Sequence, residues 1–129
     1  MDAYNAINST VAELRDKKER GVATEFLFFR ALQASHLELP RWFRSSRRAT
    51  PEEDYSRGID AVVELDVGQV KVQIKTSDIH RAKYEKAHPG NHVLVIVLGA
   101  NITLEEARKK ILKLLFLRRG EMMRAKRSK

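Results

Sequence analysis

Three polar side chains that could do metal and phosphate chemistry, Asp60, Gln73 and Lys75, lie in two short stretches of alternating apolar and polar residues. The stretches 58–65 and 69–77 have the period of two expected of half-buried β-strands. The pattern predicts a β-hairpin whose open end carries all three side chains on one face. A carboxylate, an amide and an ammonium group would therefore converge in one small volume.

The turn of this hairpin is expected at 67–68 or at 66–69, and both choices give the same register. In that register Asp60 faces Lys75 directly, and Gln73 lies diagonally from Asp60. The opposite face is wholly apolar, so a slip of one residue would turn that face to solvent. The alternation therefore predicts which side chains share a face.

Two interpretations of this cluster are open. The first is a solvated hairpin face on which Asp60 and Lys75 form an ordinary cross-strand ion pair. The second is a divalent-metal site, because Mg²⁺ takes oxygen ligands and keeps several waters. The Asp60 carboxylate, the Gln73 amide oxygen and the Ile74 carbonyl oxygen are the candidate ligands. Lys75 would then orient a water molecule or stabilise charge that builds on a phosphate.

These residues resemble the PD-(D/E)XK nuclease superfamily. The signature of that superfamily is an acid on one strand, acid-x-lysine on the next, and often a glutamate on a preceding helix. Asp60 matches the first acid, 73–75 match acid-x-lysine, and 21–25 match a helical Gly-x-x-x-Glu element that ends at Glu25. Ile59 stands at the proline position, and Gln73 replaces an acid, as in the branch similar to modified-DNA restriction enzymes. Small Holliday-junction resolvases of this superfamily are of similar size.

The resemblance spans roughly residues 21–98 and implies both a fold and an activity. The fold is α/β, with a restriction-endonuclease-like mixed sheet flanked by helices, an α-β-β-β-α-β core and a C-terminal helix. The activity is Mg²⁺- or Mn²⁺-dependent hydrolysis of phosphodiester bonds, with DNA as the expected substrate. Asp60, Gln73, Ile74 and Glu25 would hold the metal, and Lys75 would act with Asp60, Gln73 and Glu25 in catalysis. Glu25 has an alternative interpretation as a boundary glutamate paired with a nearby lysine or arginine.

The composition of the chain favours a polyanionic partner. The 129 residues carry a formal net charge of +8, which attracts nucleic acid. The alternative is a protein that is merely basic. There is no cysteine, no apolar run long enough for a membrane span and no signal-peptide pattern, so we expect a cytoplasmic protein.

Cationic residues elsewhere in the chain are candidate phosphate contacts. Guanidinium groups bind phosphate oxygens in pairs, and the stretch 41–48 interleaves arginines with two aromatic residues; the expected contacts are Arg41, Arg44, Arg47 and Arg48. The alternative is a charged edge strand that resists aggregation. Ser77 is expected to cap a helix whose N-terminal amides add to the site. His80 is a candidate proton carrier or phosphate contact.

The elements that must position these residues follow from periodicity and capping signals. Helices are expected over 2–36, 77–86 and 103–117, strands over 42–46 and 92–98, and a loop over 49–57. Val22, Phe26, Phe29 and Leu32 are the expected core stripe of the first helical region. The strand over 92–98 is continuous in apolar residues, which is typical of a central strand covered on both faces. Residues 1–117 are expected to form one domain, Gly120 to stop the last helix, and residues 118–129 to form a flexible basic tail.

Two other functions are consistent with these residues. The first is a nucleic-acid-binding module on the same fold without catalytic activity, because Gln73 lacks the carboxylate of the resembling enzymes. The second is a structural or interaction domain whose hairpin charges only form ion pairs. A homodimer is an expected assembly for the nuclease, since small enzymes of this kind often cut two strands as dimers.

Overall fold

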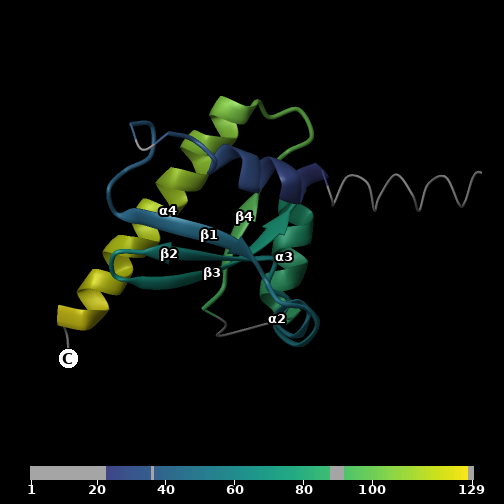
Figure 1. The fold of residues 1–129 in the computed structure, drawn as a ribbon. Helices are drawn as coiled ribbons and strands as arrows, with labels where there is room; N and C mark the ends of the chain where they lie inside the picture. Colours follow the sequence, from purple (N-terminus) through teal and green to yellow (C-terminus); the bar gives the residue numbers. More distant parts are fainter. Residues whose placement is uncertain (1–22, 36, 88–91, 128–129) are drawn as a thin grey trace, which may run out of the picture.

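The computed structural model describes residues 23–35, 37–87 and 92–127, which form a mixed four-stranded sheet with helices on its two faces (Figure 1). The elements after the first helix, which covers 23–31, are β1 (Phe43–Arg48), α2 (Pro51–Arg57), β2 (Ala61–Leu65), β3 (Gly68–Lys75), α3 (Asp78–Ala87), β4 (Leu94–Val97) and α4 (Leu104–Arg127). The strand order is β1-β2-β3-β4, with β1, β2 and β3 antiparallel and β4 parallel to β3. The predicted α/β class is confirmed.

The main core lies between one face of the sheet and the helices over 23–31 and α4. The inward side chains of β2 and β3 are those that the alternation predicted, and the fully buried members from the helices include Phe28, Ile111 and Leu115. The α3 helix lies against β3 and β4 on the other side of the sheet (Figure 1). Tyr84 is its buried side chain.

The β2–β3 register differs from the predicted one by two residues. The turn is formed by 66–67, Leu65 pairs with Gly68, and Ala61 pairs with Val72. Gly68 has a φ of 139°, a conformation that favours glycine, so it closes the turn as the first residue of β3. Because a shift of two keeps every side chain on its face, the apolar and polar faces are as predicted and only the individual pairs were wrong.

The segment expected to be a loop over 49–57 contains the helix α2 instead. Thr50 caps it reciprocally: its Oγ1 accepts the Glu53 N–H (3.2 Å), and Glu53 Oε1 accepts the Thr50 N–H (2.8 Å). Pro51 stands in the first turn, where its missing N–H costs nothing. The loop prediction was wrong because this capping box and the proline together form a start signal for a helix.

The helix over 23–31 buries a different phenylalanine from the predicted one. Phe28 is fully buried and Phe26 is 62% exposed, whereas Leu32 is buried and Phe29 partly buried as predicted. Phenylalanines at 26, 28 and 29 leave two possible phases for the apolar stripe, and packing against the sheet selects the one with Phe28 and Ala31. Val22 and the predicted helical stretch before it lie outside the described residues.

The strand β4 lies at an edge of the sheet. The prediction of a central strand was therefore wrong. It pairs with β3 alone within the described residues, with Ile74 opposite Ile96. Ile96 and Leu98 are buried in the main core, and Val97 is only 8% exposed. A continuous run of apolar residues indicates that helices cover both faces of a strand. Both faces of this edge strand are covered in that way, so the run does not show whether the strand is central.

The helix α4 was expected to end near 117 at a flexible tail, but it continues to Arg127 with Gly120 inside it. Its last turns are held by the hairpin: Arg119 binds Asp66 through two hydrogen bonds (2.9 and 2.8 Å), and Lys126 Nζ donates to the Val67 carbonyl (2.6 Å). These contacts offset the cost of a glycine in a helix, about 1 kcal/mol relative to alanine. The start of α4 is as predicted, with a capping box between Thr103 and Glu106.

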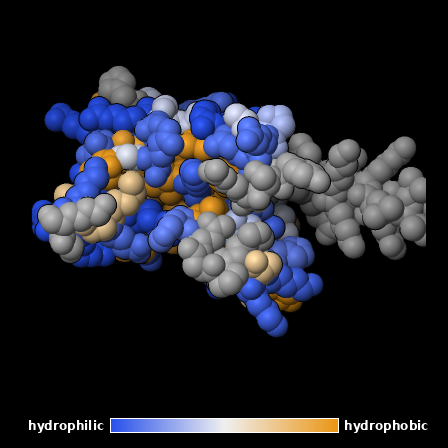
Figure 2. All heavy atoms as spheres, turned by 90° about the horizontal axis from the view of Figure 1, so that it is seen from below, coloured by the Kyte–Doolittle hydropathy of each residue, from blue (hydrophilic) through white to orange (hydrophobic). Residues whose placement is uncertain are grey.

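The surface is largely hydrophilic on the face shown in Figure 2, with apolar side chains gathered near its middle. No helix in the described part of the chain combines the length and the apolar character needed to cross a bilayer.

Candidate functional site

Asp60 lies at the open end of the β2–β3 hairpin, just before β2 begins. Its N–H donates to the Val72 carbonyl (2.8 Å), and its Oδ2 accepts the N–H of Ile74 (2.8 Å). The paired register ends with Ala61 opposite Val72, and Asp60 lies one residue beyond it, bound to the backbone of Val72 and Ile74. Lys75 lies close enough for its charge to lower the pKa of Asp60, and Gln73 is the residue between the two whose backbone groups Asp60 binds.

Gln73 is the buried polar residue of this corner. It is 8% exposed, and its Oε1 atom has no hydrogen-bond partner among the described residues. An unsatisfied buried oxygen of this kind costs about 1–3 kcal/mol. A cation, a water molecule or a ligand donor at Oε1 would remove that cost. Gln73 is therefore suited to an added partner.

The backbone of β3 contributes an oxygen to the same corner. The Val72 carbonyl and the Ile74 N–H both point toward the β2 side, where Asp60 binds them. Because the N–H and C=O of an extended residue point to the same edge of the strand, the Ile74 carbonyl also faces this edge. The Ile74 carbonyl, predicted as the third metal ligand, thus points toward the edge of β3 at which Asp60 lies.

The carboxyl group of Asp60 has its pKa raised from 3.8 to about 6. Burial is the largest cause, and the nearby carboxylates of Glu25 and Asp54 raise the pKa further. The hydrogen bond from Ile74 and the charge of Lys75 lower it, but not by enough to compensate. Negative charge is therefore concentrated around Asp60, and a bound cation would stabilise the ionised form.

Lys75 is held by an aromatic ring that sequence reasoning did not identify. Its Nζ lies 5.2 Å from the ring centroid of Tyr84, which is 7% exposed. A Cβ at Gly58 would stand 3.0 Å from Tyr84 Cε2, and Gly58 ends α2 with a φ of 65°. The glycine thus allows both the backbone turn and the approach of the ring. The signal in the sequence was Tyr84 as an apolar residue within a charged helix.

Glu25 combines the two roles considered for it. It lies close enough to raise the pKa of Asp60, as a helical glutamate beside the site would. It also pairs with Arg48 (3.5 Å), whose guanidinium lies 5.0 Å from the centroid of the Phe29 ring. Glu25 therefore faces the site while its charge is partly neutralised by an arginine.

The four arginines expected to form one phosphate rim do not converge. Arg47 hydrogen-bonds to Glu53 (2.9 Å), which lowers the pKa of Glu53 to about 2, and Arg48 pairs with Glu25. Both lie at the Asp60 end of β1. Arg41 and Arg44 are exposed and lie toward the other end, because Phe43 pairs with Leu65 beside the hairpin turn. The spacing of the arginines along an extended strand separates them, since β1 runs the length of the hairpin.

The start of α3 next to Lys75 is as expected. Ser77 Oγ accepts the N–H of His80 (3.3 Å), and the Arg81 N–H donates to the Ser77 carbonyl (3.1 Å), so Ser77 caps the helix. Thr76 Oγ1 and His80 Nδ1 are 3.2 Å apart. Phosphate contacts by Ser77 and proton transfer by His80 stay predictions.

The donor set at Asp60 fits a hard cation. It offers one carboxylate, one amide oxygen without a partner and one backbone carbonyl, and Mg²⁺ accepts such ligands with water in its other positions. No group of three His, Cys, Asp or Glu side chains that could hold a metal ion occurs within the described residues. The candidate site is therefore a sparse, water-completed site and not a cage of acids.

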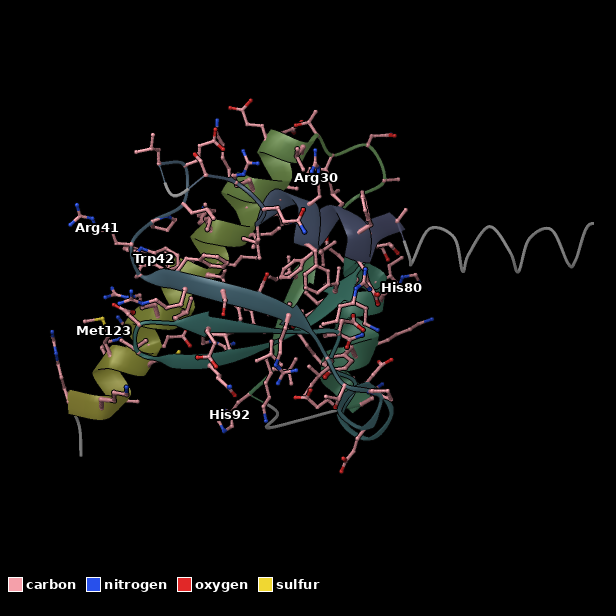
Figure 3. All side chains as sticks on the ribbon, in the orientation of Figure 1. Arg30, Arg41, Trp42, His80, His92 and Met123 are labelled. Carbon is pink, nitrogen blue, oxygen red and sulfur yellow. The ribbon has the colours of Figure 1, made fainter. Side chains whose placement is uncertain are left out.

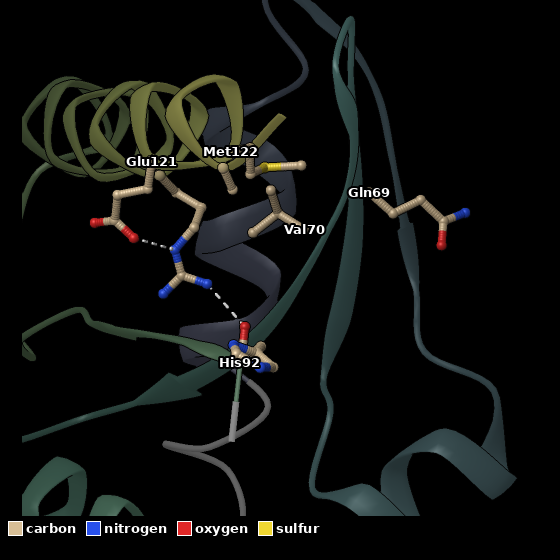
Figure 4. Close-up of a pocket in the computed structure, with 7 residues that line it drawn as sticks. Gln69, Val70, His92, Glu121 and Met122 are labelled. Carbon is tan, nitrogen blue, oxygen red and sulfur yellow. Dashed lines mark hydrogen bonds and ion pairs between the residues drawn. The ribbon is translucent and has the colours of Figure 1, made fainter. Parts of the chain in front are cut away.

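A separate hollow of about 390 Å³ lies between β3 and the second half of α4, and its lining residues do not include Asp60, Gln73 or Lys75 (Figure 4). Arg118 bridges it, donating to the His92 carbonyl (2.8 Å) and pairing with Glu121 (3.4 Å). This hollow is therefore distinct from the corner at Asp60.

No protein-family model, curated protein or solved structure matches this chain. Function must therefore be inferred from the side chains themselves.

Proposed function

We propose that this protein is a Mg²⁺- or Mn²⁺-dependent nuclease that hydrolyses phosphodiester bonds, with DNA as its substrate. The observation that carries the proposal is the buried Gln73 Oε1, which has no hydrogen-bond partner among the described residues and belongs to the residue between the two backbone contacts of Asp60. A merely structural hairpin gains nothing from burying an unsatisfied oxygen beside a half-buried acid. The sequence resemblance and the net charge of +8 support the same proposal.

Each residue of the corner has a role in this proposal. Asp60, Gln73 and the Ile74 carbonyl would hold the cation. When bound, Mg²⁺ supplies a Lewis acid for a phosphate oxygen and a water of lowered pKa. Lys75, held over the Tyr84 ring, orients the attacking water and offsets the negative charge that grows on the phosphate. Glu25 completes the site by accepting a hydrogen bond from bound water.

The raised pKa of Asp60 gives the proposed site a pH dependence. Only the carboxylate form binds a cation, and Asp60 is protonated below its pKa of about 6. Cation binding and cleavage therefore increase as pH rises from about 5 to about 7.

A cleavage assay over linear, branched, single-stranded and modified DNA, with Mg²⁺ and with Mn²⁺, tests the proposal. Lys75→Ala is expected to reduce cleavage at least about 100-fold while leaving DNA affinity nearly unchanged. Lys71→Ala is the matched control, since Lys71 lies on the same face of β3 four residues farther from the open end. Equal cleavage by Lys75→Ala and wild type would exclude this mechanism. Sedimentation with and without duplex DNA tests the proposed homodimer.

The alternative is a nucleic-acid-binding module that does not cleave. The absence of a three-acid metal group within the described residues favours it, because a neutral Gln73 attracts a cation less than a carboxylate does. Salt-sensitive binding without cleavage under every metal and DNA form in the assay would select this alternative.

A further inference from the structure

An aromatic pair, one ring exposed and the other partly buried, lies at the end of the molecule opposite to Asp60. The rings of Trp42, which precedes β1, and Phe116 on α4 are 6.2 Å apart between centroids and inclined at 48°. Phe116 is 57% exposed. Met123, two helical turns after Phe116, lies on the same face of α4, and Figure 3 shows Arg41, Trp42 and Met123 at one end of the molecule. We call Arg41, Trp42, Arg44, Phe116 and Met123 the aromatic surface.

The helix leaves the ring of Phe116 open on one side. Helical side chains tilt toward the N-terminus, so the residue at i+4 normally covers the side chain at i. At that position stands Gly120, and a Cβ there would meet only Arg124 Nη1, at 3.4 Å. Gly120 therefore adds no side chain of its own at that position, and the guanidinium of Arg124 is the group nearest to it.

The charge around this surface is positive. Arg41 and Arg44 are exposed. Asp66, the acid of the neighbouring hairpin turn, has both carboxylate oxygens bound by Arg119. Lys126, one turn beyond Met123, adds a further cation next to the same turn. The surface thus combines the exposed ring of Phe116 and the partly buried ring of Trp42 with cations that a polyanion could neutralise.

We propose that the aromatic surface binds single-stranded nucleic acid, with a base stacked on Phe116 and Trp42 and phosphates on Arg41 and Arg44. Exposed rings flanked by cations are what unpaired strands require, because every base has a face that can stack. A duplex hides those faces, and a second copy of this chain would bring two positive surfaces together. This inference adds to the proposed function the form of the substrate, which is single-stranded. It depends on the proposed function in one respect only, that the partner is nucleic acid.

The position of the surface relates it to the candidate site. The two lie at opposite ends of β1, and a six-residue strand spans about 20 Å. A bound strand that followed β1 would therefore pass from Phe116 to Arg47 and Arg48 beside Asp60. The aromatic surface would hold the unpaired part of a substrate whose backbone reaches the corner.

Fluorescence can test this binding directly, because Trp42 is the only tryptophan of the chain. The protein is titrated, in EDTA so that no cleavage occurs, with an oligothymidylate of about 12 nucleotides and with a duplex of equal length. The single strand is expected to quench Trp42 emission and the duplex to quench it far less. Phe116→Ala is expected to weaken single-strand binding roughly 10-fold, whereas Phe26→Ala, an equally exposed phenylalanine elsewhere, changes it less than about 2-fold.

A charge-matched pair provides the second measurement. Arg41→Ala is expected to reduce the salt dependence of binding by about 0.7 in the slope of log K against log salt. Arg30→Ala, which removes the same charge far from Trp42 in Figure 3, leaves that slope unchanged. Both arms are measured in EDTA, so they report binding of the oligonucleotide even if no cleavage is ever found.

Three outcomes would overturn the inference. The first is an equal effect of Phe116→Ala and Phe26→Ala on binding. The second is quenching or a spectral shift of Trp42 with vesicles of anionic phospholipid but not with the oligonucleotide, which would make this a membrane surface. The third is a dimer in sedimentation that Phe116→Ala dissociates, which would make it a contact between copies of the chain.

Discussion

The β2–β3 hairpin carries an aspartate at each end, and the two differ in what surrounds them. Asp66, at the turn, accepts two hydrogen bonds from Arg119, and this contact lowers its pKa. Asp60, at the open end, accepts one backbone N–H at its Oδ2, lies near other acids, and has its pKa raised to about 6. The fold stabilises the ionised carboxylate of Asp66, whereas it destabilises the ionised carboxylate of Asp60.

The comparison separates structural acids from candidate site acids. Opposite charge and full hydrogen bonding stabilise the ionised form of Asp66, so it needs no further partner. Burial and like charge destabilise the ionised form of Asp60, and the Gln73 Oε1 nearby has no hydrogen-bond partner within the part of the chain that the structure describes. A raised carboxyl pKa next to an oxygen that lacks a hydrogen-bond partner is characteristic of functional sites. The opposite ends of one hairpin therefore serve different purposes.

The largest expected difference between the two aspartates is in cleavage. Asp60→Asn keeps an acceptor for the Ile74 N–H but removes the charge that would hold the cation, so Mg²⁺-dependent cleavage is expected to fall at least about 100-fold. Asp66→Asn is the matched control and is expected to cleave within about 2-fold of wild type. Initial rates on one DNA substrate measure both. A reversed order of the two variants would contradict the assignment of Asp60.

The free energy of unfolding should depend on pH in opposite ways for Asp60 and Asp66. The pKa of Asp60 is higher in the folded chain than its ordinary value of 3.8, so folding favours the protonated form. Wild-type stability is therefore expected to fall as pH rises from about 4 to about 6, and Asp60→Asn, which cannot ionise, to be about 1–2 kcal/mol more stable above pH 6 after allowance for partial solvent screening.

For Asp66 the sign is opposite. Its pKa is lowered in the folded chain, so its contribution is present at neutral pH and is lost as pH falls through that lowered value. Asp66→Asn is expected to be less stable than wild type at neutral pH and equal to it in strong acid. Denaturant unfolding at several pH values measures both variants, and a destabilised Asp60→Asn at pH 7 without metal would contradict the account.

A smaller effect is expected from the ring that holds Lys75. Tyr84→Phe keeps the ring and is expected to cleave nearly as wild type, whereas Tyr84→Leu loses the cation–π contact, worth about 0.5–1 kcal/mol, and is expected to be about 2–5-fold slower. The ε-methylene protons of Lys75 should lose an upfield ring-current shift in Tyr84→Leu only. An unchanged Lys75 spectrum in that variant would show that the ring does not position the ammonium.

Local sequence signals predicted the hairpin and its faces, but not its register. Alternation fixes which face a side chain occupies, whereas the register depends on where the turn closes, and Gly68 could serve inside the turn or after it. The observed register ends before Asp60, so the predicted direct pair of Asp60 with Lys75 is replaced by contacts of Asp60 with the backbone of Val72 and Ile74. Glu25 near Asp60 was also within reach of sequence reasoning, through its place in a helical motif.

Tertiary contacts were beyond the sequence signals. Nothing in the spacing of Tyr84 indicates that its ring meets Lys75, because the contact depends on how α3 returns to β3. The extension of α4 past Gly120 depends likewise on Arg119 meeting Asp66. In both cases a long-range contact overrides a local propensity.

Manganese titration followed by NMR tests the central claim most directly, because Mn²⁺ broadens resonances near its binding site. The account predicts selective broadening of the Gln73 side-chain amide and of the Ile74 and Lys75 backbone amides at substoichiometric Mn²⁺. Gln69 lies on the same strand as Gln73 but near the turn, where its side-chain amide donates to Glu64, and its resonance should stay sharp. Asp60→Asn should abolish the broadening at Gln73. Equal broadening at Gln69 and Gln73, or none at Gln73, would contradict a cation site at the open end of the hairpin.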